Sequence, residues 1–348
     1  MNKKKNIWNV VFLVVVFALT IYLIFKGEDI GEIYFYIRNT KMQYWVLAVA
    51  CVILFIESEA FIIYYMMRTL KQKIKLTHCL LYSFVGFFFS CITPSATGGQ
   101  PAQIYYMKKD DLPIPISTLV LIIVTLAYKF ILVLLGGLIF LIRPGRIMIL
   151  LKPVMGICYF GWFLNVICVI FMVLLVVKPQ IAHDMVTAII HLLSRMHLLR
   201  KKERILERFD RAMVQYKDVA GYFVSHKLVV MNVLIITLIQ RLLLFFVGYL
   251  AYRSFGLKEE SVMTLVILQG MISVAVDMLP LPGGMGISEK MFLVIFAPVF
   301  GSVTLPAMVI SRGLSYYTEL IISAIMTVVT HLSIGRERKG KKRNDRIL

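Results

Sequence analysis

The chain has 348 residues, 59% of them hydrophobic, and its mean hydropathy is +0.82. A soluble globular protein must keep a polar surface, so this composition excludes one and predicts an integral membrane protein. The formal net charge of +19 indicates contact with anionic partners, among which anionic membrane lipids come first.

Six segments are apolar over roughly the 20 residues that a helix needs to cross a bilayer. We predict full spans at about 7–25, 43–67, 116–142, 153–177, 228–252 and 303–332. The first apolar run is too long for a signal-peptide core and lacks a small-residue cleavage site, so we interpret it as a span. The expected fold class is therefore an all-α polytopic membrane protein.

Two further apolar segments, at about 78–106 and 261–300, are interrupted by proline and glycine. The interruptions contain Thr93, Ser95, Thr97, Gly98, Gly99 and Gln100 in the first segment, and Pro282, Gly283, Gly284 and Gly286 in the second. Non-helical backbone at membrane depth needs protein or a wet cavity to receive its polar groups. We predict two re-entrant hairpins, with pairs of tilted half-spans as an open alternative. A further alternative is that the glycines are packing points in ordinary spans.

The predicted segments form two triplets that run in opposite directions. One is 43–67, the hairpin 78–106 and 116–142; the other is 228–252, the hairpin 261–300 and 303–332. Such inverted-topology repeats place a binding site near the midplane, where the broken elements meet. The expected division is a first membrane half (1–177), a linker (178–227), a second membrane half (228–332) and a tail (333–348).

Most of the 38 lysine and arginine residues fall on the side of the predicted membrane that carries both termini. The positive-inside rule then places both termini in the cytoplasm. The linker interleaves apolar and basic residues, which indicates an amphipathic helix on the anionic cytoplasmic leaflet, and the basic tail suits the same surface. The alternative is a solvated linker. Neither segment carries an aromatic stacking platform, so we expect no direct nucleic-acid partner.

Ionisable side chains inside spans cost about 2.5–3.5 kcal/mol each on insertion scales and are functional candidates by default. In this chain they are Glu57, Glu59, Lys129, Arg241, Asp277, Arg312 and Glu319. We expect Glu57 to pair with Lys129, and Arg241 or Arg312 to pair with Asp277 or Glu319, as structural or charge-coupling pairs. Arginine also offers a planar fork for a lipid phosphate. Backbone N–H groups at the glycine breaks would add donors for the same anion.

Motifs of catalysis and metal binding are missing from the sequence. It contains no His-Glu-x-x-His, no paired-cysteine spacing and no Gly-x-Ser-x-Gly. Five cysteines without regular spacing argue against a disulfide framework. We expect no catalytic residue, metal or cofactor, and His78 is the only histidine placed to titrate near a break.

The two breaks resemble those of the lysylphosphatidylglycerol synthase transmembrane-region family, also called flippase-like proteins, which is the membrane half of the multiple peptide resistance factor. The matching residues are Thr93 to Pro101 with Ile104, Tyr105 and Tyr106, then Pro282 to Gly286 with Glu289, and Arg312 with Tyr316 and Tyr317. The resemblance covers nearly the whole chain. Other branches often carry an acid and then an arginine where this chain has Gln100 and Gln103.

The resemblance implies a multi-pass protein of the bacterial cytoplasmic membrane that moves a lipid between leaflets and is linked to antimicrobial peptide resistance. The expected substrate is an anionic or aminoacylated phospholipid such as (lysyl-)phosphatidylglycerol. It would contact the residues of both breaks together with Arg241, Glu289 and Arg312, and Arg312→Ala would abolish transport in a folded protein. Glu57, Glu59, Asp277 and Glu289 would attract a cationic headgroup or carry coupling protons.

Two other functions stay open. Full-length resistance factors lysylate phosphatidylglycerol with a soluble C-terminal domain, which we expect to be absent here, so a phosphatidylglycerol lysyltransferase would need a separate soluble partner. The other is a membrane scaffold for a polyprenyl-linked glycosyltransferase. A homo-oligomer is compatible with each of the three functions.

Overall fold

The computed structural model describes residues 30–196 and 202–344. Every regular element in this part of the chain is helical, and one isolated antiparallel β-bridge joins Pro94 to Pro282. The span expected at 7–25 lies outside the described residues, as do residues 197–201 of the linker and the last four residues of the tail.

Five stretches of the described chain are long and apolar enough to cross a membrane. Each of the five spans predicted beyond residue 29 overlaps one of them, and the last, 303–332, ends one residue beyond its stretch. They are α3 (Met42–Thr69), α6 (Ile114–Ile142), Gly145–Val177, α11 (Lys227–Ser254) and Ile287–His331. A helix suits this apolar environment because all its backbone hydrogen bonds form within the segment.

Two of these stretches contain more than one helical element. Gly145–Val177 comprises α7 (Gly145–Leu151), the 3-10 turn η1 (Lys152–Val154) and α8 (Met155–Val177). Ile287–His331 runs through α13 (Ile287–Phe300), the 3-10 turn η2 (Gly301–Val303), α14 (Thr304–Arg312), the π-helical turn η3 (Gly313–Tyr317) and the start of α15 (Thr318–Asn344). π-Turns inside helices are frequent at functional sites because they re-aim the side chains that follow.

Both glycine-containing segments are broken helices. The first consists of α4 (Leu76–Ile92) and α5 (Gly99–Lys109), and the second of α12 (Val262–Val276) and α13. Ser95 and Ala96 in the first loop, and Gly283, Gly284 and Gly286 in the second, have positive φ angles, which no right-handed helix contains. The glycines are therefore not packing points of uninterrupted helices. With 17 and 15 residues, α4 and α12 are also short for a bilayer.

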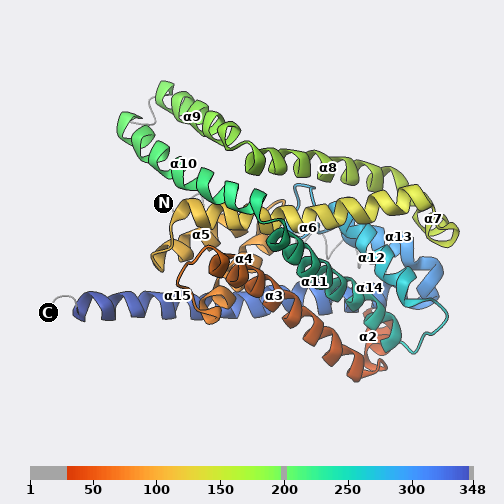
Figure 1. Ribbon diagram of the computed structural model, residues 1–348. Helices are drawn as coiled ribbons and strands as arrows, with labels where there is room; N and C mark the ends of the chain where they lie inside the picture. The colour runs from red at the N-terminus through yellow and green to blue at the C-terminus, as the bar shows by residue number, and fades with distance from the viewer. Residues whose placement is uncertain (1–29, 197–201, 345–348) are drawn as a thin grey trace.

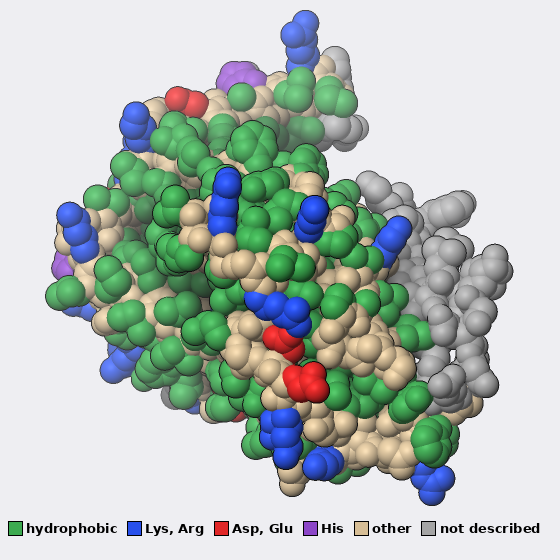
Figure 2. Space-filling model, turned by 90° about the vertical axis from the view of Figure 1, so that its right-hand side faces the viewer, with side chains coloured by type: hydrophobic (Ala, Val, Ile, Leu, Met, Phe, Trp, Pro, Cys, Tyr) green, Lys and Arg blue, Asp and Glu red, His purple; other side chains and the backbone are tan. Residues whose placement is uncertain are grey.

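The helices alternate in direction between two ends of the molecule (Figure 1). One end carries α5, the helices α9 (Pro179–Arg195) and α10 (Lys202–Ser225), and the C-terminal end of α15. The other end carries α7 and α2 (Ile30–Arg38). The α4–α5 pair enters from the first end and the α12–α13 pair from the second, which is the arrangement that an inverted repeat requires. Figure 2 looks onto the second end, whose surface is mostly hydrophobic with scattered Lys and Arg.

The core is continuous across the two halves. Helix α3 packs along α11, α4 packs on α15, and α12 packs on α6 and α8. Gly161 of α8 allows the last contact, because a Cβ there would lie 2.4 Å from the Ala275 carbonyl oxygen. Helix α10 packs against α6 and buries Ala220 and Phe223, so this part of the linker belongs to the folded body rather than to a solvated connection.

Candidate functional site

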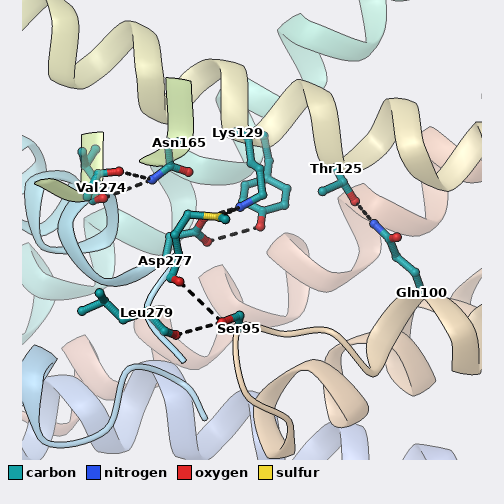
Figure 3. Close-up of polar contacts among 11 residues, drawn as sticks. Ser95, Gln100, Thr125, Lys129, Asn165, Val274, Asp277 and Leu279 are labelled. Atoms are coloured by element: carbon teal, nitrogen blue, oxygen red, sulfur yellow. Dashed lines mark hydrogen bonds and ion pairs between the residues drawn. The ribbon is translucent and has the colours of Figure 1, made fainter. Parts of the chain in front are cut away.

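The tips of the two broken helix pairs meet. Beside the Pro94–Pro282 bridge, the Ser95 hydroxyl donates to the Leu279 carbonyl at 3.1 Å (Figure 3). These residues come from loops that enter from opposite ends of the molecule. The two breaks therefore lie together, as we predict from the sequence.

Hydroxyl groups in the first loop hold the loop itself. Thr93 Oγ1 donates to the Phe89 carbonyl at 2.6 Å and accepts from the Gly98 N–H at 2.9 Å, so it closes α4 and starts α5. Thr97 Oγ1 donates to the Pro94 carbonyl at 2.9 Å. A Cβ on Gly99 would lie 2.7 Å from the Gly86 carbonyl oxygen, so only glycine lets α5 begin against α4. The threonine hydroxyls are thus already bonded within the loop.

Arg312 and Glu289 hold the second tip. Arg312 Nε donates to Glu289 Oε1 at 2.7 Å, and its Nη2 donates to the Gly283 carbonyl at 3.0 Å. Glu289 Oε2 accepts from the Gly286 N–H at 2.6 Å and from the Ser288 hydroxyl at 3.0 Å. The Glu289 side chain is 4% exposed. The expected pairing of Arg312 with Asp277 or Glu319 is therefore wrong, because its guanidinium closes the loop that precedes α13.

Lys129 binds across the two halves of the chain. Its Nζ lies 2.5 Å from Asp277 Oδ2, and the Tyr128 hydroxyl donates to Asp277 Oδ1 at 3.2 Å (Figure 3). The expected Glu57–Lys129 pair is wrong, since Glu57 is exposed on the outer face of α3. Successive side chains of a helix point about 100° apart, so Glu57 and Glu59 lie on opposite faces.

Amide side chains connect the broken helices to their neighbours. Gln100 of α5 donates to the Thr125 hydroxyl of α6, and Gln103 donates to Glu59 Oε1 at 2.8 Å. Asn165 of α8 donates to the Val274 carbonyl at 3.2 Å, which satisfies an acceptor in the last turn of α12 (Figure 3). Carbonyls at a helix end buried without such a partner would be costly.

Arg241, Glu59 and Glu319 form a third group of interior charges, which we call the central cluster. The guanidinium carbon of Arg241 lies 5.0 Å from the Phe55 ring centroid and 4.5 Å from that of Tyr128. Its Nε is buried and has no hydrogen-bond partner among the described residues. Glu319 accepts from the Cys91 thiol at 3.5 Å. Both carboxylates are close enough to Arg241 to interact with it electrostatically, yet neither forms an ion pair with it in the described structure.

Comparison with known protein families identifies the family of this chain. The model of the family described as the lysylphosphatidylglycerol synthase TM region matches residues 8–323. The chain belongs to this family. The matched range includes both tips and the whole central cluster, and it supports a multi-pass membrane protein with a lysylphosphatidylglycerol-related role. Comparison with the curated proteins gives no match.

The lysylphosphatidylglycerol synthase TM region fold brings most of the expected site residues together but gives them unequal roles. At the second tip, Arg312 and Glu289 bind each other and the loop backbone. At the first tip, the threonines bond near their own loop, whereas Ser95 and Gln100 bond to Leu279 and Thr125. The Nε of Arg241 has no hydrogen-bond partner in the part of the chain that the structure describes. The structure adds residues that the sequence reasoning left without a role: Cys91, Gln103, Tyr128 and Asn165. They are polar groups scattered along apolar helices and acquire meaning only from their distant contacts.

Proposed function

We propose that this protein moves an anionic or aminoacylated phospholipid, such as phosphatidylglycerol or lysyl-phosphatidylglycerol, between the leaflets of its membrane. In this proposal the α4–α5 and α12–α13 pairs are re-entrant hairpins whose tips meet near the midplane. Arg241 binds the lipid phosphate beside them. The observation that carries the proposal is that Lys129 and Arg312 have carboxylate partners at short distance, whereas the Nε of Arg241 has no partner among the described residues.

The surroundings of Arg241 suit a phosphodiester. A guanidinium presents its N–H groups as a fork that matches two phosphate oxygens, and the resulting charge-assisted hydrogen bonds are strong. The rings of Phe55 and Tyr128 stabilise the cation without occupying its N–H donors. Glu59 and Glu319 would then receive the ammonium group of an aminoacylated headgroup. All three cluster residues are partly exposed, although the Nε of Arg241 itself is buried.

Leaflet-resolved lipid movement in proteoliposomes tests this function. Fluorescent phosphatidylglycerol, lysyl-phosphatidylglycerol and phosphatidylcholine would be compared by quenching of the outer leaflet. We expect the first two lipids to move faster than phosphatidylcholine. Arg241→Gln should slow them by at least about tenfold, because a hydrogen bond to a charged group contributes about 1.5–3 kcal/mol.

Arg146→Gln is the matched control. Arg146 is exposed at the α7 end of the molecule and pairs with Glu260, so its loss should leave lipid movement unchanged. Unchanged movement in Arg241→Gln would contradict the proposal. If no lipid moved, a lysyl-tRNA-dependent lipid product from the same membranes would favour the transferase. Co-purification with a glycosyltransferase would instead favour the scaffold.

A further inference from the structure

The charged groups in the interior of the described structure do not balance. Lys129 pairs with Asp277 and Arg312 pairs with Glu289. Arg241 interacts electrostatically with two carboxylates, those of Glu59 and Glu319. The remaining charges at this depth, Glu57 and Lys290, are exposed on the outside of their helices and do not compensate the excess acid.

Each carboxylate of the central cluster has weak support of its own. Glu59 accepts one hydrogen bond from a neutral amide, Gln103, at 2.8 Å, and Glu319 accepts one from a thiol, Cys91, at 3.5 Å. A buried carboxylate usually needs several donors or a close cation to remain ionised. One arginine can neutralise one of the two acids. The other acid is therefore most stable with a proton bound.

Binding of a phosphate to Arg241 changes this balance. The phosphate takes the positive charge that stabilises the ionised carboxylate, and two like charges close together in a poorly polar environment repel strongly. The cluster can restore neutrality by taking up one further proton from the water on the side where the lipid enters. An aminoacylated lipid brings ammonium charge of its own, from two amino groups in a lysyl headgroup. One ammonium group can occupy the position of that proton, so no proton needs to be taken up with the lipid.

We propose that each anionic phospholipid bound at Arg241 is accompanied by one proton, which binds to Glu59 or Glu319, whereas an aminoacylated phospholipid crosses without it. The inference rests on the proposed function and names the coupling ion of the same site. The proton forms an O–H bond with a carboxylate oxygen on entry. That bond breaks on release, when the proton returns to water on the other side and the carboxylate regains Arg241 as its counterion.

Other ionisable groups around the cluster do not replace the two acids. They are Cys91 from α4, Tyr128 and Lys129 from α6, Asp277 from the second tip, Arg312 from α14, and Tyr316 from η3. A thiol and phenols in their ordinary state are neutral near pH 7. Lys129, Asp277 and Arg312 are already engaged in ion pairs. The two glutamates are the groups in this set whose charge is not fixed by a partner.

Proton uptake in proteoliposomes that hold a pH-sensitive dye tests the proposal on the unaltered protein. Phosphatidylglycerol added to the outer leaflet should acidify the lumen as it moves inward, by about one proton per lipid on charge balance, and lysyl-phosphatidylglycerol should not. An alkaline lumen should speed the inward movement of phosphatidylglycerol alone. If phosphatidylglycerol moves without protons, the coupling is refuted while the proposed function stands. If neither lipid moves, the proposed function itself fails.

Variants of the cluster give a second, sharper test. In Glu59→Gln or Glu319→Gln one acid remains beside Arg241, so phosphate binding still requires a proton and coupling should persist. In the double variant no acid remains, so phosphatidylglycerol should move without protons and without response to a pH gradient. Glu57→Gln, on the exposed face of the same helix as Glu59, is the matched control and should stay coupled. Coupling that survives in the double variant would overturn the proposal.

Discussion

Lys129 Nζ lies 2.5 Å from Asp277 Oδ2, and this ion pair joins the middle of α6 in the first half of the chain to the tip of the broken helix in the second. Lys129 is 6% exposed, and its Nζ also lies 2.9 Å from the Met278 sulfur. A buried cation with one carboxylate partner fixes the position of that partner, because separating the two would leave an uncompensated charge. The pair therefore positions the second tip against the first.

Removing one member of this pair should destabilise the protein far more than removing both. Lys129→Met leaves Asp277 without its cation, and we expect a loss of about 3–5 kcal/mol in the free energy of unfolding. Asp277→Asn should cost a similar amount. The double variant should recover a large part of the loss, since no buried charge remains. Denaturant unfolding in detergent micelles, followed by circular dichroism, measures all three.

The exposed pair Arg146–Glu260 is the control for that cycle. Its arginine side chain is 55% exposed, and exposed pairs contribute about 0–1 kcal/mol, so Arg146→Gln should change stability little. Equal losses in the Lys129 single variant and the double variant would show that the two charges do not depend on each other.

We expect substitution of Arg312 to destabilise the fold, and substitution of Arg241 to slow lipid movement without loss of stability. Because Arg312 binds Glu289 and the Gly283 carbonyl together, Arg312→Ala should open the second tip and lower the midpoint of thermal unfolding. This differs from the sequence expectation that the alanine variant stays folded. Arg241→Gln should retain the wild-type midpoint. The reverse pattern would exchange the roles of the two arginines.

Bilayer physics explains what the sequence could predict. A membrane fixes the length of a spanning helix, so uninterrupted apolar runs located α3, α6, α8 and α11. Proline and glycine clusters located both breaks, because no other residues interrupt a helix so readily. The charge bias between the two sides predicts a cytoplasmic location for both termini, and it stays a prediction.

The pairing of interior charges could not be predicted in the same way. Helix α3 is apolar nearly all round, so its pattern does not show that Glu57 faces outward and Glu59 inward. The partner of Lys129 is 148 positions away, and that of Arg312 is 23 positions away. Such pairs depend on how the tips pack against distant helices, and the local sequence does not predict that packing.

The contact between α9 and α10 should depend on pH. In α9, His183 Nδ1 lies 3.1 Å from Oδ1 of the neighbouring Asp184, and His183 Nε2 lies 3.1 Å from Oδ1 of Asp210 in α10. Hydrogen bonds to these two carboxylates raise the pKa of His183. The hydrogen bond to His183 in turn lowers the pKa of Asp184. A raised histidine pKa stabilises the folded contact below the ordinary value of about 6.5, and that stabilisation is lost as the pH rises through the raised value.

Within α9, Asp184 sets the lower limit for its own hydrogen bond with His183, because that contribution is lost as the pH falls through the lowered pKa of Asp184. Amide hydrogen exchange in α9, corrected for the intrinsic rate at each pH, should show strongest protection in mildly acidic buffer and weaker protection at alkaline pH. His183→Gln should remove this dependence. His191→Gln, an exposed position on the same helix, should retain it. An unchanged profile in the His183 variant would assign the dependence to another group.

Gly283→Ala should be more destabilising than Gly301→Ala although the two glycines have nearly the same φ angle. Their φ angles are +57° and +56°, and a residue other than glycine held at such a sparsely populated φ angle costs about 1–3 kcal/mol. At Gly301 a Cβ would meet nothing within 4 Å, whereas at Gly283 it would lie 2.1 Å from the Tyr316 ring. Overpacking of that kind adds about 1–3 kcal/mol and would move Tyr316 away from the Cys91 carbonyl, to which its hydroxyl donates at 3.0 Å. Thermal unfolding of both variants in one detergent measures the difference, and equal midpoints would mean that Tyr316 yields without cost.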